Sequence, residues 1–135
     1  MAVPAYSRGD NLLQVFSSVR GLLVFTIRTT RNEAHFKRRH HDDLGAPIVA
    51  LTRRMMHGVF EADAVDSTTE DGKARRVLLQ EDVAMAHSAL LAEVMVAHDM
   101  GLKPAKLREW TILLNDFYAI FSKWRRSGKS GLLGR

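Results

Sequence analysis

The sequence predicts an all-α fold, a small antiparallel bundle of about four helices joined by short links. Apolar residues recur at steps of three and four along most of the 135-residue chain, which is the period of an amphipathic helix. Apolar residues make up 46% and charged residues 26%, proportions typical of a folded domain with its own core. A link of only three residues, GLK at 101–103, also forces two of the predicted helices into an antiparallel hairpin.

The first predicted helix begins at Asp10, a suitable N-cap, after an N-terminal arm at 1–9. Its apolar stripe consists of Leu12, Phe16, Val19, Leu23 and Ile27. The pattern extends through Ala34 to about His41. The β-branched and aromatic residues of 21–30 also suit a strand. Because tight-turn signals are missing at both flanks, we favour a buried helix there, kinked at Gly21 or near 29–30.

A break at LGAP, 44–47, separates this helix from the second, and Pro47 suits its first turn. The second helix carries one apolar face, which consists of Ile48, Leu51, Met55 and Val59. It is followed by EADAVDSTTEDG, 61–72, which has five acids, no base and several turn-forming residues. We expect an exposed acidic loop at 61–72.

The third helix has the clearest period and ends at Gly101, the position of a C-cap glycine. Its start is expected between Lys73 and Glu81. The fourth begins at Pro104 and ends at 127–128, before a basic tail at 128–135. The methionines Met55, Met56, Met85, Met95 and Met100, with the aromatic residues of the fourth helix, fall at helical spacing, so we expect them to fill the core.

The GKS triplet at 128–130 invites comparison with a phosphate-binding loop. That loop requires G-x-x-x-x-G-K-[ST] between a strand and a helix, because its first glycine lets the backbone amides encircle the phosphates. Here Lys123 occupies the position of the first glycine, and the triplet follows a helix. The tail is therefore expected to be a solvated basic end, and no nucleotide or other cofactor is predicted.

The absence of cysteine excludes disulfides, thiolate zinc sites and cysteine nucleophiles. The N-terminus lacks the basic start and apolar run of a signal peptide. The longest uninterrupted apolar run, 22–25, is too short for a bilayer. These observations predict a soluble cytoplasmic protein with no membrane partner.

The six histidines show no H-E-x-x-H spacing, and three of them, His35, His40 and His41, lie among cations that would repel a metal ion. No metal site is expected. Arg28 and His35 are separated by six residues, and this R-x6-H spacing resembles the signature of helical HEPN-type ribonucleases. The resemblance implies a composite site in which His35 acts as general acid or base.

Cations are strongly segregated along the chain, which carries a net charge of +5. One basic segment spans 20–39 and contains six cations and a single acid, and a second runs from Phe121 to the C-terminus with no acid. Segregated charge predicts one basic face that follows a phosphate backbone through counterion release, without reading sequence. The residues expected to bind are Arg28, Arg31, Lys37, Arg38, Arg39, Lys123, Arg125 and Arg126, followed by Arg53, Arg54, Arg75 and Arg76. Trp124, beside two arginines, is a candidate for stacking on a base.

Two basic segments, TIRTTRNEAHFKRRHH (26–41) and SKWRRSGKSG (122–131), thus frame a cysteine-free bundle. This arrangement resembles the small helical subunits of multi-subunit class 1 CRISPR effector complexes, and also the helical accessory proteins of diversity-generating retroelements. Both resemblances imply a non-catalytic, self-associating protein that contacts RNA or DNA within a larger complex. The apolar residues Leu22, Val24 and Phe25 are expected to be exposed for a neighbouring subunit.

We therefore expect a non-enzymatic, nucleic-acid-backbone-binding subunit of a nucleoprotein complex, present in several copies along a single strand of RNA or DNA. The alternative is a structural or adaptor protein whose basic face meets an acidic protein, for example in a phage or secretion particle. The HEPN-like ribonuclease is the enzymatic alternative.

Overall fold

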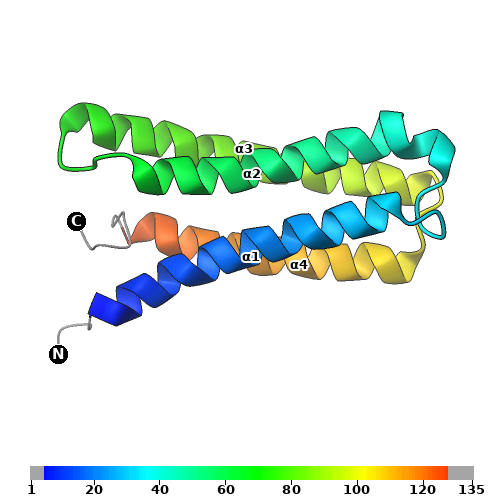
Figure 1. Ribbon diagram of the computed structural model, residues 1–135, viewed down its shortest axis with the longest axis horizontal. Helices are drawn as coiled ribbons and strands as arrows, with labels where there is room; N and C mark the ends of the chain where they lie inside the picture. The colour runs from blue at the N-terminus through cyan, green and yellow to red at the C-terminus, as the bar shows by residue number, and fades with distance from the viewer. Residues whose placement is uncertain (1–4, 128–135) are drawn as a thin grey trace.

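The computed structural model describes the backbone of residues 5–127 and the side chains from Leu12 onward. Within that range the chain forms four α-helices and no strand, which confirms the predicted helical bundle (Figure 1). The helices are α1 (Ala5–Arg31), α2 (Ala46–Ala64), α3 (Glu70–Asp99) and α4 (Pro104–Arg126). A 3-10 turn, Arg38–His40, and a π-helical turn, His41–Gly45, connect α1 to α2.

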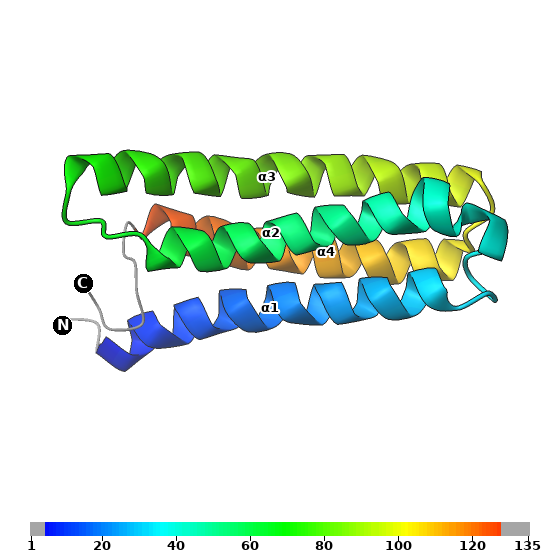
Figure 2. The same cartoon turned by 45° about the horizontal axis from the view of Figure 1, so that its top comes forward.

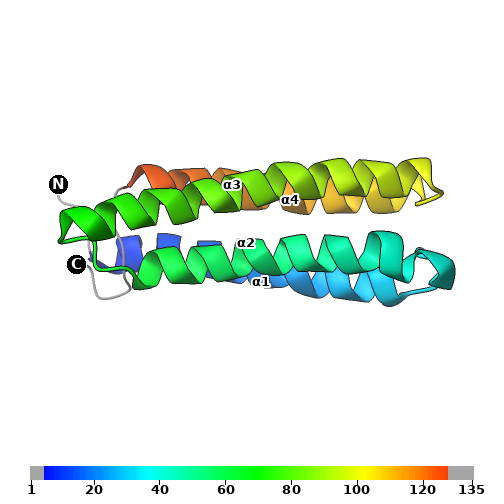
Figure 3. The same cartoon turned by 90° about the horizontal axis from the view of Figure 1, so that it is seen from above.

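The helices are arranged as a square in which each helix contacts the next one in the chain and α4 contacts α1. Successive helices run in opposite directions, as Figures 2 and 3 show. We call the end that holds residues 32–45 and the α3–α4 turn, 100–103, the connector end. The opposite end, where α1 begins, α4 ends and the α2–α3 loop lies, is the terminal end (Figure 1).

One apolar core runs the length of the bundle, and Trp110 on α4 lies in it with no exposed surface. Its indole Nε1 donates a hydrogen bond of 3.2 Å to the hydroxyl of Thr26 on α1, and that hydroxyl donates to the Leu22 carbonyl at 2.7 Å. The indole N–H therefore has a partner inside the core, as a buried donor requires. The ring edges of Phe25 and Phe36 pack against the same tryptophan.

Residues 22–30 belong to α1, so the helical alternative was right for this segment. Its β-branched residues suit a helix because the Thr30 hydroxyl donates to the Thr26 carbonyl one turn earlier, at 2.9 Å. The ends of α1 were predicted less well. The helix begins at Ala5, before the expected cap at Asp10, and it ends at Arg31 rather than near His41.

The α2–α3 loop is shorter than the expected 61–72, because α2 continues to Ala64 and α3 already begins at Glu70. The hydroxyl of Thr69 accepts a hydrogen bond from the Gly72 amide at 3.0 Å and so caps the first turn of α3. The tight α3–α4 hairpin is as predicted. Gly101 has a φ of 120°, a conformation that favours glycine, and α4 starts at Pro104.

Several apolar residues are not where the sequence predicted. Leu22 is 1% exposed and belongs to the core, whereas Val24 is exposed and Phe25 is half-buried. Of the methionines expected in the core, Met85 and Met95 on α3, and Met100 just after it, are all more than half exposed. Helical spacing alone could not separate the two sides of α3, because apolar residues of its second half, such as Met85 and Met95, occur on its outward side as well as its core side.

One segment of the described chain, Leu12–Arg31, is long and apolar enough to span a bilayer by length and composition. The segment contains no long uninterrupted apolar run, because polar residues are interspersed throughout it. In the bundle, Val15, Val19 and Leu22 of this segment are buried in the core. Helices buried in a protein core can have the same length and composition, so core packing accounts for the apolar character of α1.

Candidate nucleic-acid interface

The connector end is built by a segment that leaves α1 abruptly and is fixed at two points. The Asn32 side-chain carbonyl accepts a hydrogen bond of 2.9 Å from the Ala34 amide, an Asx-type turn that replaces the next helical turn. Phe36, 3% exposed, then inserts against Trp110, and Leu44 is buried in the π-helical turn just before α2. Because these two apolar residues hold the segment at its ends, Lys37, Arg38 and Arg39 between them lie at the surface.

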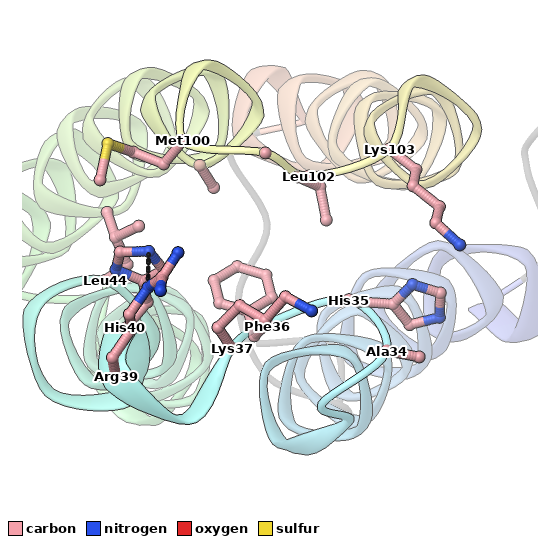
Figure 4. Close-up of a pocket in the computed structure, with 12 residues that line it drawn as sticks. Ala34, His35, Phe36, Lys37, Arg39, His40, Leu44, Met100, Leu102 and Lys103 are labelled. Carbon is pink, nitrogen blue, oxygen red and sulfur yellow. Dashed lines mark hydrogen bonds between the residues drawn. The ribbon is translucent and has the colours of Figure 1, made fainter.

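A hollow of about 360 Å³ separates this segment from the α3–α4 turn. Its lining includes no acidic residue, and Phe36, Leu44 and Leu102 supply apolar wall. In Figure 4 the Lys37 and Lys103 side chains reach toward His35 from the two walls, and Arg39 and His40 lie together at the far side. The basic residues of the lining are His35, Lys37, Arg39, His40 and Lys103.

His35 has an electrostatic environment that disfavours its protonated form. Burial lowers the pKa of His35, the nearby charges of Lys106 and Lys103 lower it further, and Glu109 opposes them. Its Nδ1 atom is shielded from solvent and has no hydrogen-bond partner among the described residues. An anion placed beside this ring would reverse the repulsion and supply the missing partner.

His35 also borders a second hollow, of about 310 Å³, between α1 and the start of α4. Arg28 lies in that lining, so the two residues of the R-x6-H pattern share one surface depression. The other cation of this hollow, Lys106, pairs with Glu109 at 2.8 Å and lies 5.2 Å from the centre of the Phe25 ring. The depression is positively charged but contains no acid that could orient the histidine for catalysis.

Five of the predicted binding residues are gathered at the connector end, all of them exposed: Arg28, Arg31, Lys37, Arg38 and Arg39. None of the five has an ion pair within 4 Å in the part of the chain whose side chains are described. Arg53 on α2 joins them, since it lines a shallow hollow together with Arg31. Sequence analysis missed Lys103 and Lys106, which precede and begin α4, because only the fold of the hairpin brings them to His35.

The second basic segment lies at the terminal end, so the prediction of one continuous basic face was wrong. Lys106 and Lys123 are 17 residues apart on α4, about 26 Å along its axis. Arg125 and Arg126 follow at the last turn of α4, where cations also complement the helix dipole. Arg75 lies at the same end, exposed on the second turn of α3.

Arg76 is not a surface cation, contrary to the prediction. It is only 5% exposed, and its guanidinium carbon lies 4.9 Å from the centre of the Trp124 ring. Burial lowers the pKa of Arg76, and the charge of Asp63 partly compensates. Trp124 is itself 3% exposed, so its ring packs under this arginine and is not accessible to a base.

Arg54 is exposed but forms an intramolecular ion pair at the surface. Its guanidinium donates two hydrogen bonds to the carboxylate of Asp82 on α3, one of them 2.9 Å long from Nε. These bonds lower the pKa of Asp82. The pair links α2 to α3, so a phosphate would have to compete with Asp82 for the Arg54 guanidinium.

The remaining sequence-based expectations about chemistry concern metals and the GKS triplet. Among residues 12–127 no group of three or more potential metal ligands occurs. His87 is buried and its Nε2 lies 3.0 Å from the Leu114 carbonyl, which makes it a packing residue with a satisfied ring nitrogen. The triplet at 128–130 lies outside the described residues, and α4 ends just before it at Arg126.

Comparisons with known proteins found no match for this chain among protein families, curated proteins or solved structures.

Proposed function

We propose that this protein binds the phosphate backbone of nucleic acid without catalysing a reaction, as one subunit of a larger nucleoprotein complex. The observation that carries the proposal is the hollow at the connector end, where five basic side chains and no acid surround an opening beside exposed arginines. Such a surface gains free energy by releasing counterions from the nucleic acid. The likeness to small CRISPR effector subunits belongs to this proposal and is supported by the same basic helical architecture.

The geometry suggests how one phosphate would be held. Lys37 and Lys103 approach from different walls, so a phosphate between them would meet two ammonium groups and the shielded Nδ1 of His35. Charged hydrogen bonds of this kind are stronger than neutral ones. The flanking arginines would meet neighbouring phosphates, and their planar guanidinium groups suit bidentate contacts with phosphate oxygens.

Fluorescence anisotropy of labelled single-stranded RNA, single-stranded DNA and duplexes, titrated across a salt series, tests the proposal. The double variant Lys37→Gln/Lys103→Gln should weaken binding and lower the salt slope by about 1.4, since each single-strand phosphate contact contributes about 0.7. The matched control, Lys73→Gln/Arg108→Gln, removes the same charge from exposed positions outside the hollow and should leave the slope nearly unchanged.

Two results would overturn the proposal: no binding to any of these nucleic acids at low salt, or an equal effect of both double variants. The first result would favour the adaptor alternative, in which the basic end meets an acidic protein. The same purified protein tests the ribonuclease alternative, which the shared depression of Arg28 and His35 keeps open. Cleavage of labelled RNA that His35→Ala abolishes would replace the non-catalytic proposal.

A further inference from the structure

A second basic hollow lies at the connector end and shares no lining residue with the first. Its volume is about 380 Å³, and it lies between the end of α1 and the start of α2, two helices that Figure 3 shows side by side. Its lining contains three basic side chains, those of Arg31, His41 and Arg53, and no acid. We call it the α1–α2 hollow, and we call the hollow that contains Lys37 and Lys103 the connector hollow.

Small residues keep the α1–α2 hollow open. Gly45, Ala46 and Ala50 belong to its lining, and none of them has a side chain larger than a methyl group. Gly45 lies against the end of α1, since a Cβ added to it would be 3.6 Å from the Cβ of Thr30. The Thr30 hydroxyl donates to carbonyls of α1 at 2.9 and 3.2 Å. Any ligand in the hollow would therefore be held by the three basic side chains.

These basic side chains are available to an anion. Arg31 and Arg53 are exposed, and neither has an ion pair within 4 Å among the residues whose side chains are described. The Nε2 atom of His41 is shielded from solvent and has no hydrogen-bond partner in the same part of the chain. Neither of the two acids that follow His41 lines the hollow, and one of them, Asp43, lies 3.6 Å from His40. The hollow thus combines positive charge with an unpartnered ring nitrogen.

We infer that the α1–α2 hollow binds a second phosphate of the nucleic acid strand that occupies the connector hollow, an inference that rests on the proposed function. The guanidinium groups of Arg31 and Arg53 come from two different helices and could each donate to phosphate oxygens. The hollow also borders the start of α2, where the helix dipole favours an anion. Two separate basic hollows at one end of the bundle suit a polymer that carries a phosphate at every residue.

The two hollows define where the strand would cross the connector segment. His40 lines the connector hollow and His41, the next residue, lines the α1–α2 hollow. Arg38 and Arg39, which directly precede them, are exposed. A strand bound in both hollows would pass over this stretch and bring its phosphates close to these arginines. This path stays at the connector end and needs none of the cations at the terminal end.

NMR of the histidine side chains of the full chain, titrated with inorganic phosphate at constant pH and ionic strength, tests the α1–α2 hollow by itself. We expect phosphate to shift the His41 ring signals, and to do so equally in Lys37→Gln/Lys103→Gln, because those lysines belong to the other hollow. Arg53→Gln should abolish the His41 shift. The matched control, Arg54→Gln, removes the same charge from the next residue, which is outside the lining, and should preserve the shift.

Anisotropy with a labelled single strand of about 16 nucleotides tests whether one strand uses both hollows. Arg31→Gln/Arg53→Gln should lower the salt slope by about 1.4, since each single-strand phosphate contact contributes about 0.7. Combined with Lys37→Gln/Lys103→Gln, the loss should reach about 2.8, because the two hollows share no residue.

Three results would overturn the inference: no change of the His41 signals with phosphate, equal effects of Arg53→Gln and Arg54→Gln, or a wild-type salt slope in Arg31→Gln/Arg53→Gln. If Lys37→Gln/Lys103→Gln still lowers the slope in the last case, the proposed function stands and only the second site fails. If neither double variant changes the slope, the proposed function fails, and the assignment of the α1–α2 hollow to a strand fails with it.

Discussion

The contact between α2 and α3 provides a sharp test of the fold on which both proposals depend. Gly58 on α2 faces Val83 on α3, and a Cβ added at Gly58 would lie 2.5 Å from a Val83 methyl carbon. Ordinary carbon–carbon contacts are about 3.5–4.0 Å, so Gly58→Ala would require a shift of about 1 Å at a fully buried site.

The expected magnitude follows from two opposing terms. Replacing glycine by alanine inside a helix stabilises it by about 1 kcal/mol, whereas overpacking a core costs about 1–3 kcal/mol. Gly58→Ala should therefore lower the free energy of unfolding by about 0–2 kcal/mol. Val83→Ala alone should lower it by about 2–3 kcal/mol, since it removes two buried methyl groups and leaves a cavity.

The double variant Gly58→Ala/Val83→Ala decides whether these residues touch. The methyl group added at position 58 would occupy the space vacated by the valine side chain, so the double variant should be more stable than additivity predicts by about 1–3 kcal/mol. Urea unfolding followed by circular dichroism at 222 nm measures all four proteins. Additivity within about 0.5 kcal/mol would refute the predicted contact between α2 and α3.

The remaining two predictions concern buried polar groups. Burial lowers the pKa of His87 below its ordinary value of 6.5, so the unfolded chain binds a proton more readily and stability should fall as the pH drops below about 6.5. Urea unfolding of His87→Leu should show a smaller loss between pH 7 and 5, and an unchanged loss would contradict this role. Arg76→Met should keep the stability within about 1.5 kcal/mol of the wild type and leave nucleic-acid affinity unchanged, because Arg76 is buried against Trp124. A lower affinity or a shallower salt slope in anisotropy would show that Arg76 contributes to nucleic-acid binding.

The fold could be predicted from local properties of the chain. Apolar periodicity identified four helices, and Gly101 with Pro104 fixed the α3–α4 hairpin, because a positive φ and a first-turn proline depend on adjacent residues only. Helix ends were less predictable. The start of α3 depends on Thr69 reaching the Gly72 amide, and the end of α1 on the Asn32 turn, both of which compete with continued helix.

The candidate site was predictable only in part. The sequence correctly indicated that the cations of 31–39 are exposed. It could not show that Lys103, more than sixty residues later, lies across a hollow from His35. Nor could it show that the second basic segment lies at the other end of the bundle. That separation depends on the direction and length of α4, which carries the chain away from the connector end.

The sequence by itself thus determined the helical class, the hairpin and the surplus of positive charge, since these follow from residue types and their spacing. The tertiary structure alone decided which polar and apolar residues are accessible. Arg76 and Arg54 have the same chemistry as Arg38, yet Arg76 is buried beside Trp124 and the exposed Arg54 is paired with Asp82. Met85 has the same chemistry as Met55, yet only Met55 faces the core. These differences arise because accessibility depends on which side of each helix meets a neighbour, and that is set by the packing of the whole bundle.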